Sequence, residues 1–450
     1  MKMVDENEAI PLYLFTYNCG KSLIKPESFI NNLVPTFPDE LADIYVFGLQ
    51  ELCPILDGSF HELANKYLIE YNDFFLRALK QKYGDEDTIF QTLGLHHIGA
   101  IGIIAISPYR LKFSKIRVAG SGYGYGYSSM KGGVGMRVLY KKNPLSDKSV
   151  ELTFANAHLT ANEGEYYYLQ RNSNLFNLMR SLDFGDGYGL LKTNSHTFFM
   201  GDLNYRTCQK FSVTSPTTID LLRLQDQSLV PSIEIENLVE KYDELYRGKT
   251  RGDIFIGFSE PCINFAPTYK FNVNTAIYSL KRSPSWCDRI LYQSTYPKDD
   301  LFVSLTNDSN SHNKDFQGSL PKIHKYNSIN SILQSDHQPV YLSITVPFNP
   351  PNPIVSSSGF LQILESEQPN RHSHSSGDSP NITSMFDETI SGPTEIYMKP
   401  TRLDFFIQTY IRYVSDKFIG YLLYYVTTRN GRLYLLIMLL AVWLYRYFIT

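Results

Sequence analysis

The chain has 450 residues, and 42 Lys and Arg against 45 Asp and Glu give it a formal net charge of −3. This near balance argues against a global basic field that would recruit nucleic acid. The five cysteines are odd in number, scattered and never in a CxxC pair, which argues against a disulfide framework or a zinc site. Residues 1–8 are acidic and lack the apolar stretch of a signal peptide, so we expect the folded part in a reducing, cytosolic environment.

Short apolar runs and longer helical patterns alternate between residues 10 and 347. The runs that predict buried or half-buried strands are Leu12–Thr16, Ile44–Gly48, Ala100–Ser107, Glu151–Ala157, Thr197–Met200, Arg289–Tyr292 and Val340–Val346. The stretches that predict helices are Pro26–Leu33, Glu62–Lys82, Glu163–Leu182, Thr217–Leu224 and Ile233–Arg247. Strands interspersed with helices favour two packed sheets flanked by helices, and we expect residues 1–347 to form one large α/β domain.

The composition changes after the last expected strand. Residues 348–400 are rich in Pro, Ser, His and Gly and predict a disordered linker. Residues 401–432 are aromatic with interspersed charges, and Leu403–Val426 fits an amphipathic helix at a membrane surface. Residues 433–449 contain one charge, Arg446, and would span roughly 25 Å as a helix at about 1.5 Å per residue. They predict a C-terminal transmembrane tail anchor, because a buried core helix is a poor alternative behind a disordered linker.

The flanks of this segment indicate its orientation and its membrane. Arg429 and Arg432 precede it, which predicts that the preceding chain lies in the cytosol. Its short apolar length fits the hydrocarbon core of roughly 27 Å of endoplasmic-reticulum bilayers. We therefore expect an endoplasmic-reticulum protein whose folded domain faces the cytosol, with the mitochondrial outer membrane as the alternative. If flexible, the linker would reach roughly 40 Å.

Polar side chains follow several of the apolar runs. Asn18 and Glu51 follow the first two, and a hard divalent cation prefers such oxygen ligands. His158 ends a third run, where a lone His is also a common structural hydrogen bonder. Asp202 and Asn204 are two residues apart in an extended segment and so share a face, although the same pair suits a turn. Together these residue types are those of a metal-assisted phosphoesterase.

Three motifs carry a resemblance to a known family. They are Gly-Asp-Leu-Asn at 201–204, Pro-Ser-Trp-Cys-Asp-Arg-Ile-Leu at 284–291 and Ser-Asp-His at 335–337. They resemble the motifs of the inositol polyphosphate 5-phosphatases, a branch of the exonuclease-endonuclease-phosphatase superfamily, and the tail makes the chain most similar to its small tail-anchored members. The resemblance covers about residues 10–347. It implies a four-layer sandwich of two β-sheets flanked by helices, as in DNase I.

The resemblance implies a Mg²⁺ site. Glu51 would be the principal carboxylate ligand, with Asn18 beside it at the end of the neighbouring strand. Asp336 would point toward the metal as a water-mediated ligand. Mg²⁺ usually takes few protein carboxylates and leaves positions for water and phosphate, which this sparse set allows.

It also implies catalytic roles. Asp202 would orient and deprotonate the attacking water, with His337 as the alternative base. Asp288 and His337 form a coupled pair, because an Asp that accepts from one ring nitrogen fixes the imidazole tautomer. His158 would donate to a phosphate oxygen, and Asn204 would bind phosphate or the water.

The remaining candidates would bind substrate. Tyr269, Lys270 and Arg282 match family positions that contact the neighbouring 4-phosphate, although a solvated basic surface is the alternative. Arg206 could bind phosphate or cap a helix. Lys131 is retained in the loop that relatives place beside the lipid chains.

That loop, Gly120–Gly135, departs from the family pattern. Met130 stands where Asn is usual, and Tyr123, Tyr125 and Tyr127 alternate with glycine. Tyrosine is enriched at membrane interfaces, so these side chains would suit one.

The expected function is Mg²⁺-dependent hydrolysis of the 5-phosphate of phosphatidylinositol 4,5-bisphosphate, giving phosphatidylinositol 4-phosphate. A nuclease or sphingomyelinase of the same superfamily would share the Glu, Asp-x-Asn and Asp-His pattern but would not explain Tyr269 and Lys270 with the 284–291 motif. A non-catalytic phosphoinositide-binding tether is disfavoured because no expected catalytic residue is missing. The sequence leaves open activity on the 3,4,5-trisphosphate lipid and on soluble inositol phosphates.

Overall fold

The computed structural model describes residues 9–21, 25–84, 88–225, 230–297, 320–362 and 396–449. The strands are β1 (Ala9–Asn18), β2 (Ile44–Gln50), β3 (Gln91–Ile98), β4 (Ile101–Ser107), β5 (Phe113–Gly122), β6 (Gly132–Tyr140), β7 (Val150–His158), β8 (Ser195–Asp202), β9 (Phe258–Ser259), β10 (Asp288–Gln293), β11 (Lys322–Ser328) and β12 (Val340–Pro347). The helices are α1 (Pro26–Leu33), α2 (Ile55–Gly58), α3 (His61–Tyr83), α4 (Glu165–Ser181), α5 (Pro216–Leu222), α6 (Ser232–Tyr242), α7 (Glu244–Thr250), α9 (Arg402–Phe406), α10 (Arg412–Thr427) and α11 (Arg429–Ile449).

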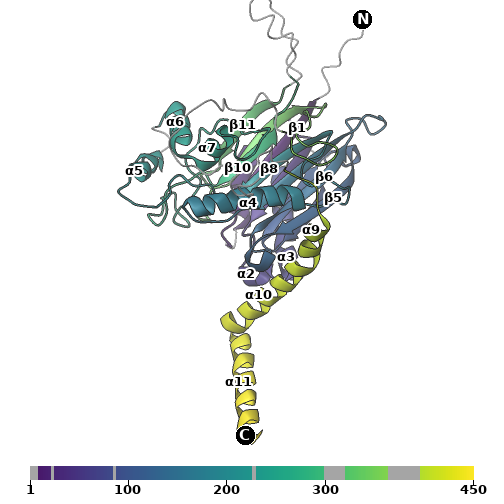
Figure 1. Cartoon of the computed structure of the whole chain (residues 1–450). Helices are drawn as coiled ribbons and strands as arrows, with labels where there is room; N and C mark the ends of the chain where they lie inside the picture. Colours follow the sequence, from purple (N-terminus) through teal and green to yellow (C-terminus); the bar gives the residue numbers. More distant parts are fainter. Residues whose placement is uncertain are drawn as a thin grey trace, which may run out of the picture.

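Two six-stranded sheets pack face to face with helices outside them (Figure 1). One sheet has the order β11-β12-β1-β2-β4-β3 and the other β5-β6-β7-β8-β10-β9. Helices α1 and α3 pack on the outer face of the first sheet, and α4 and α7 on the outer face of the second. The predicted four-layer α/β sandwich is confirmed.

The alternation of side chains along β1 explains why its sequence is almost uniformly apolar. Leu12 and Leu14 face the second sheet and belong to the core between the sheets. Tyr13 and Phe15 face the opposite way and pack with the helices α1 and α3. Because successive residues of a strand point to opposite faces, a strand between two apolar layers must be apolar at every position.

Each sheet has one parallel pair among its central strands, and these pairs gather the polar residues at one end of the sandwich. In the first pair, Asn18 at the end of β1 lies opposite Gln50, one residue before Glu51. In the second, His158 at the end of β7 lies opposite Asp202 at the end of β8. Parallel strands end at the same edge of a sheet, so the residues that follow them meet there.

The predicted helix over Ile233–Arg247 is wrong, because the chain breaks at Asp243. This residue is extended, with φ −72° and ψ 122°, and its side chain accepts a hydrogen bond from the Tyr246 N–H at the start of α7. Asp243 is fully buried and forms an ion pair with Arg289 at 2.8 Å. The helical periodicity gave no sign of this cap, because Arg289, the residue that pairs with Asp243, lies far away in the sequence.

The predicted boundary between the domain and a disordered linker at residue 348 is also wrong. Ile354, Val355 and Met398 are buried in the cluster outside the second sheet, together with Leu175 and Leu178 of α4. Composition did not reveal this packing because the apolar residues are few and separated by Pro and Ser. Residues 363–395, the rest of the predicted linker, lie outside the described residues.

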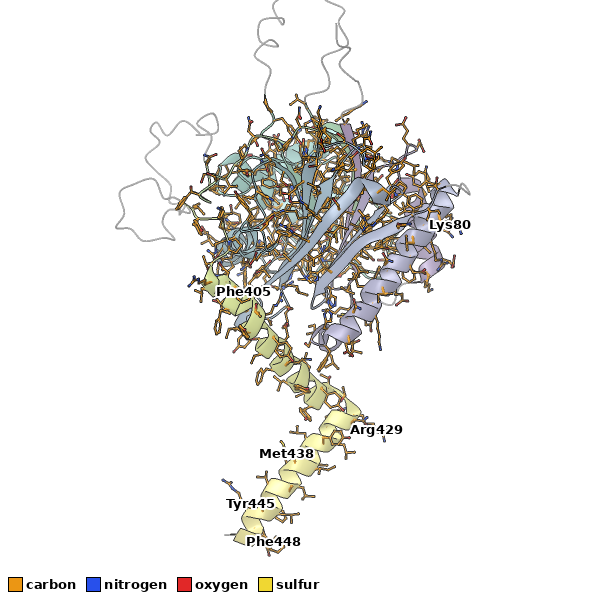
Figure 2. The ribbon with its side chains drawn as sticks, turned by 90° about the vertical axis from the view of Figure 1, so that its right-hand side faces the viewer. Lys80, Phe405, Arg429, Met438, Tyr445 and Phe448 are labelled. Atoms are coloured by element: carbon orange, nitrogen blue, oxygen red, sulfur yellow. The ribbon has the colours of Figure 1, made fainter. Side chains whose placement is uncertain are left out.

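The C-terminal segment forms helices that leave the domain. Helices α9 and α10 are joined by a π-helical turn at Ile407–Ile411, and α10 ends at Thr427, because the next residue, Thr428, is extended. Helix α11 then projects away from the sandwich, with Arg429 near its start and Phe448 near its end (Figure 2). It is long and apolar enough to be a candidate membrane span.

Candidate active site

Asp202 lies at the centre of the polar cluster. Its Oδ2 accepts a hydrogen bond of 2.9 Å from the Asn18 amide and lies 3.2 Å from Nε2 of His158, and its Oδ1 accepts from the Asn204 N–H at 3.2 Å. Burial alone would raise the pKa of Asp202, but His337, His158 and Lys131 outweigh it and hold the pKa well below its usual range. Asp202 is therefore an ionised and oriented hydrogen-bond acceptor.

Asp288 and His337 form the predicted pair. Nδ1 of His337 lies 2.9 Å from Asp288 Oδ2, and its Nε2 lies 3.9 Å from Asp202 Oδ2. Burial alone would lower the pKa of His337, but the carboxylates of Asp288 and Asp202 have the larger effect and raise the pKa to about 9. The imidazole ring lies between two carboxylates and is thus positively charged, with both ring nitrogens protonated, at neutral pH.

Glu51 lies beside this cluster with a partly exposed carboxylate. One of its oxygens lies 3.0 Å from the Lys21 ammonium and the other 3.9 Å from His158 Nε2. Burial raises its pKa, but the positive charges of His158, Lys21 and Lys131 lower it overall. Its φ of 46° is in the left-handed region, a strained backbone typical of functional sites.

Two sets of side chains in the described residues could hold a divalent cation. The Glu51 carboxylate and the Asn18 amide stand at the ends of the paired strands β2 and β1 and offer oxygen donors of the kind that Mg²⁺ prefers. The Lys21 ammonium lies 3.0 Å from Glu51, at a position that the cation would take over. Asp202, Asp288 and His337 form the second set, with one ligand atom each within 4.8 Å of the others. Because Asp288 and His337 already bind each other, we assign the second set to proton handling.

Arg206 is buried beside Asp202 and has donors available for an anion. Its Nε donates to the Asn204 carbonyl at 3.1 Å, its Nη2 contacts the Asn204 side chain, and its guanidinium stacks 4.5 Å from the Tyr269 ring. Its Nη1 is buried and has no partner among the described residues. A buried N–H without an acceptor is costly, so this position suits a phosphate oxygen.

The other predicted substrate residues surround this centre. The Lys131 ammonium contacts His158 Nε2, and burial lowers the pKa of Lys131 to about 8. Lys270 forms an ion pair with Asp336, so the role of Asp336 as a metal ligand stays a prediction. Arg282 is half-buried and donates to Asn162 at 3.3 Å, in the loop that follows His158.

Sequence reasoning missed two members of the cluster. Lys21 pairs with Glu51, and Thr268 donates a 2.7 Å hydrogen bond to Asp288 Oδ2. Thr268 stands directly before Tyr269, one of the predicted substrate residues, and this position in the sequence was an available signal. Lys21 carried no signal, because its role depends on the turn between β1 and α1.

Comparison with known proteins decides the family. Residues 15–343 match the model of the endonuclease/exonuclease/phosphatase family 2. The chain belongs to this family. Similar curated proteins are human phosphatidylinositol 3,4,5-trisphosphate 5-phosphatase 1, with 26% identity over 318 residues, and rat synaptojanin-2, with 27% over 319. The matches cover 66% and 68% of this chain but only 22% and 19% of these relatives.

Solved structures confirm the fold. The inositol polyphosphate 5-phosphatase domain of SPsynaptojanin, in complex with inositol (1,4)-bisphosphate and calcium, has a TM-score of 0.56 and 22% identity, covering 75% of this chain and 84% of that one. A Cimex nitrophorin with bound NO has a TM-score of 0.50 and 19% identity, covering 76% of this chain and 99% of that one. A fold shared by proteins with such different ligands does not establish an activity, so the function has to be argued from the site.

Proposed function

We propose that this chain is a Mg²⁺-dependent phosphatase that removes the 5-phosphate of phosphatidylinositol 4,5-bisphosphate and leaves phosphatidylinositol 4-phosphate. The observation that carries the proposal is the buried cluster around Asp202, which combines an ionised acceptor, a charged imidazole and a guanidinium N–H that has no partner within the described ranges. These are the groups needed to position water and to stabilise a transferring phosphoryl group. The 5-phosphatase names of relatives support the choice of phosphate.

The proposed mechanism assigns one task to each side chain. Asp202 orients the attacking water, and a weakly basic carboxylate suffices because a loose phosphoryl transition state needs positioning more than a strong base. We assign His337 the role of a donor rather than of the base, because Asp288 and Asp202 raise its pKa to about 9. It donates toward the phosphate together with His158 and Arg206. Bound Mg²⁺, held by Glu51 and Asn18, would neutralise charge on the phosphate oxygens.

The test is phosphate release by the full chain in detergent with and without EDTA. We expect release from phosphatidylinositol 4,5-bisphosphate that stops in EDTA and returns with Mg²⁺. Cleavage of DNA or sphingomyelin in preference to this lipid would support the competing members of the superfamily. Tight lipid binding without phosphate release would support a non-catalytic tether.

Replacing Glu51 by Gln should raise the Mg²⁺ concentration needed for half-maximal activity, with little change in the unfolding temperature. A neutral amide binds a hard dication less well than a carboxylate does. Glu62→Gln is a matched control, because Glu62 is an exposed residue on α3. The measurement is a Mg²⁺ titration of phosphate release, and an unchanged midpoint would remove Glu51 from the metal site.

Replacing Lys270 or Arg282 by Ala should reduce the preference for the 4,5-bisphosphate over the 5-monophosphate lipid. A charged hydrogen bond to the 4-phosphate contributes roughly 1.5–3 kcal/mol, or about one to two powers of ten in relative kcat/KM. The measurement is kcat/KM on both lipids for each variant. Equal losses on both would mean that these residues bind the 5-phosphate or the membrane instead.

We also propose that α11 anchors the chain in the endoplasmic-reticulum membrane with the sandwich in the cytosol. Its exposed apolar side chains, such as Leu436, Ile437 and Leu440, support the proposal, since a helix apolar on all sides needs a non-aqueous environment. A fluorescent protein fused to residues 401–450 should localise to the endoplasmic reticulum and resist carbonate extraction. A fusion found in the cytosol, or on mitochondria, would contradict this location.

A further inference from the structure

The helical segment before α11 is docked on the domain, whereas the sequence predicted an amphipathic helix at the membrane surface. The segment consists of α9, the π-helical turn and α10, and we call it the strut. It starts beside the sandwich near Phe405 and runs to Arg429 (Figure 2). Its contacts with the domain extend from Asp404 to Tyr421, about 25 Å of helix at ~1.5 Å per residue.

The middle of the strut binds the hairpin loop 123–131 and its flanks by paired hydrogen bonds. The Gln408 side chain accepts from the Gly122 N–H at 2.8 Å and donates to the Gly122 carbonyl at 3.0 Å. The Asp416 carboxylate accepts from both the N–H and the hydroxyl of Ser129, each at 2.7 Å. These two pairs of bonds fix the rotation of the helix about its own axis, because each pair uses two atoms of one side chain.

The two ends of the strut are held by other contacts. Near its start, Asp404 forms an ion pair of 3.0 Å with Arg180 of α4. Near its end, Gly420 is buried against the chain after α2, where an added Cβ would lie 2.8 Å from Cβ of Ser59. The Phe60 ring packs edge-on against Tyr421 with centroids 5.7 Å apart. Contacts at both ends and in the middle hold a helix in one orientation.

All of these contacts except that to Arg180 belong to the active-site end of the sandwich. Loop 123–131 ends at Lys131, which contacts His158, and α2 begins four residues after Glu51. Helices α10 and α11 leave the sandwich at the end where α2 lies (Figure 1). The catalytic cluster and the candidate membrane span therefore lie on the same side of the domain.

The remaining length of the strut is short. From its last contact at Tyr421 to the start of α11 at Arg429 the chain extends about 12 Å at ~1.5 Å per residue. A free linker of the predicted length would instead allow roughly 40 Å. The docked strut thus fixes the active-site end close to the point where α11 begins.

The exposed face of the strut is apolar and continuous in sequence with α11. Its exposed large side chains are Leu403, Phe405, Phe406, Tyr410, Tyr413, Val414, Phe418, Tyr421, Leu422, Tyr425 and Val426. On the docked loop, Tyr125, Tyr127 and Met130 are exposed as well. An aromatic and aliphatic surface of this kind, joined to a candidate span, fits the interface of a lipid bilayer.

We infer that the strut presses the active-site end of the domain against the bilayer that holds α11, so that the enzyme takes substrate lipid only from its own membrane. The inference rests on the proposed activity and anchor. An apposed membrane would meet the opposite end of the sandwich, away from the catalytic cluster.

The test uses the full chain reconstituted in phosphatidylcholine vesicles with one dye-labelled phosphatidylinositol 4,5-bisphosphate. A second population of vesicles, free of protein, carries the same lipid with another dye. We expect the wild type to hydrolyse lipid of its own vesicles faster than that of the second population by at least about tenfold, as for a tethered enzyme at high effective concentration. Equal rates on both populations would overturn the inference.

A double variant that should release the strut from the domain, Arg180→Asp with Gly420→Leu, tests the strut itself, and we call it the latch variant. An aspartate at position 180 would repel Asp404. A leucine at position 420 would clash with Ser59 and move the helix away from it, while leucine itself favours helix formation. The control is Arg180→Lys with Thr427→Leu, which keeps the charge at 180 and places the leucine at an exposed position of α10. Each rate is divided by the rate on a short-chain, water-soluble form of phosphatidylinositol 4,5-bisphosphate, which cancels any general loss of activity.

In the latch variant the normalised rate on lipid of the vesicles that hold the enzyme should fall by roughly five- to tenfold, because the effective concentration drops. Amide hydrogen exchange of residues 122–131 should also accelerate. The control should keep the wild-type ratio and protection. If exchange accelerates while the ratio stays unchanged, the strut does not orient the enzyme and the inference fails. If the wild type is in the vesicles but releases no phosphate from any substrate, the proposed function fails instead.

Discussion

Replacing Asp202 by Asn, or His337 by Ala, should lower turnover on phosphatidylinositol 4,5-bisphosphate by at least about a hundredfold, the scale of lost proton-transfer and positioning catalysis. The amide in Asp202→Asn would keep a hydrogen-bonding shape but lose the charge that orients the water and holds the proton on His337. The His337→Ala change would remove the imidazolium and leave the buried Asp288 with Thr268 as its side-chain hydrogen-bond partner among the described residues. The measurement is kcat under saturating Mg²⁺.

The two effects should combine less than additively, because Asp202 and His337 act on the same phosphoryl group as one unit. Asp73→Asn and His324→Ala are matched controls, since both residues are exposed and lie away from the strand ends that form the cluster. Unfolding by urea separates catalytic loss from loss of fold. Turnover like that of the wild type in either active-site variant would remove that residue from the catalytic cluster.

Much of the fold could be predicted from the sequence because its strands are buried on both faces. The run at residues 12–16 is apolar at successive positions since Tyr13 and Phe15 meet helices while Leu12 and Leu14 meet the other sheet. The same logic placed Asp202 and His158 correctly at strand ends. Their meeting follows from the parallel pairing of β7 with β8, which places the two residues directly opposite each other.

What could not be predicted depends on contacts between residues far apart in the chain. Thr268 and Lys21 join the active-site cluster only through the folded positions of Asp288 and Glu51. The docking of the strut depends in the same way on Gln408 meeting the backbone of Gly122, since a backbone partner leaves no trace in side-chain composition. Local periodicity also suggested one helix where the buried Asp243, paired with Arg289, ends it.

Ending the chain after Pro347 should destabilise the domain, although every catalytic motif lies upstream of that position. The truncation removes Ile354, Val355 and Met398, each about 1% exposed in the folded chain. Full burial of such a side chain contributes roughly 1.5–3 kcal/mol, and a domain is stable by only about 5–15 kcal/mol. The truncated form should therefore unfold at a much lower urea concentration, and a sizeable fraction should be unfolded without denaturant.

The matched control is a chain ending after Thr401, which keeps all three buried residues and omits the strut and α11. The chain has two tryptophans, Trp286 and Trp443, and Trp443 lies in α11. Both truncated forms thus report unfolding through the single buried Trp286, whose fluorescence can be followed in urea. The midpoint should lie higher for the form ending after Thr401, because the slope changes little between chains of such similar size. Coincident midpoints would show that residues 348–362 and 396–400 lie on the second sheet without contributing to its stability, and Pro347 would then be the true end of the folding unit.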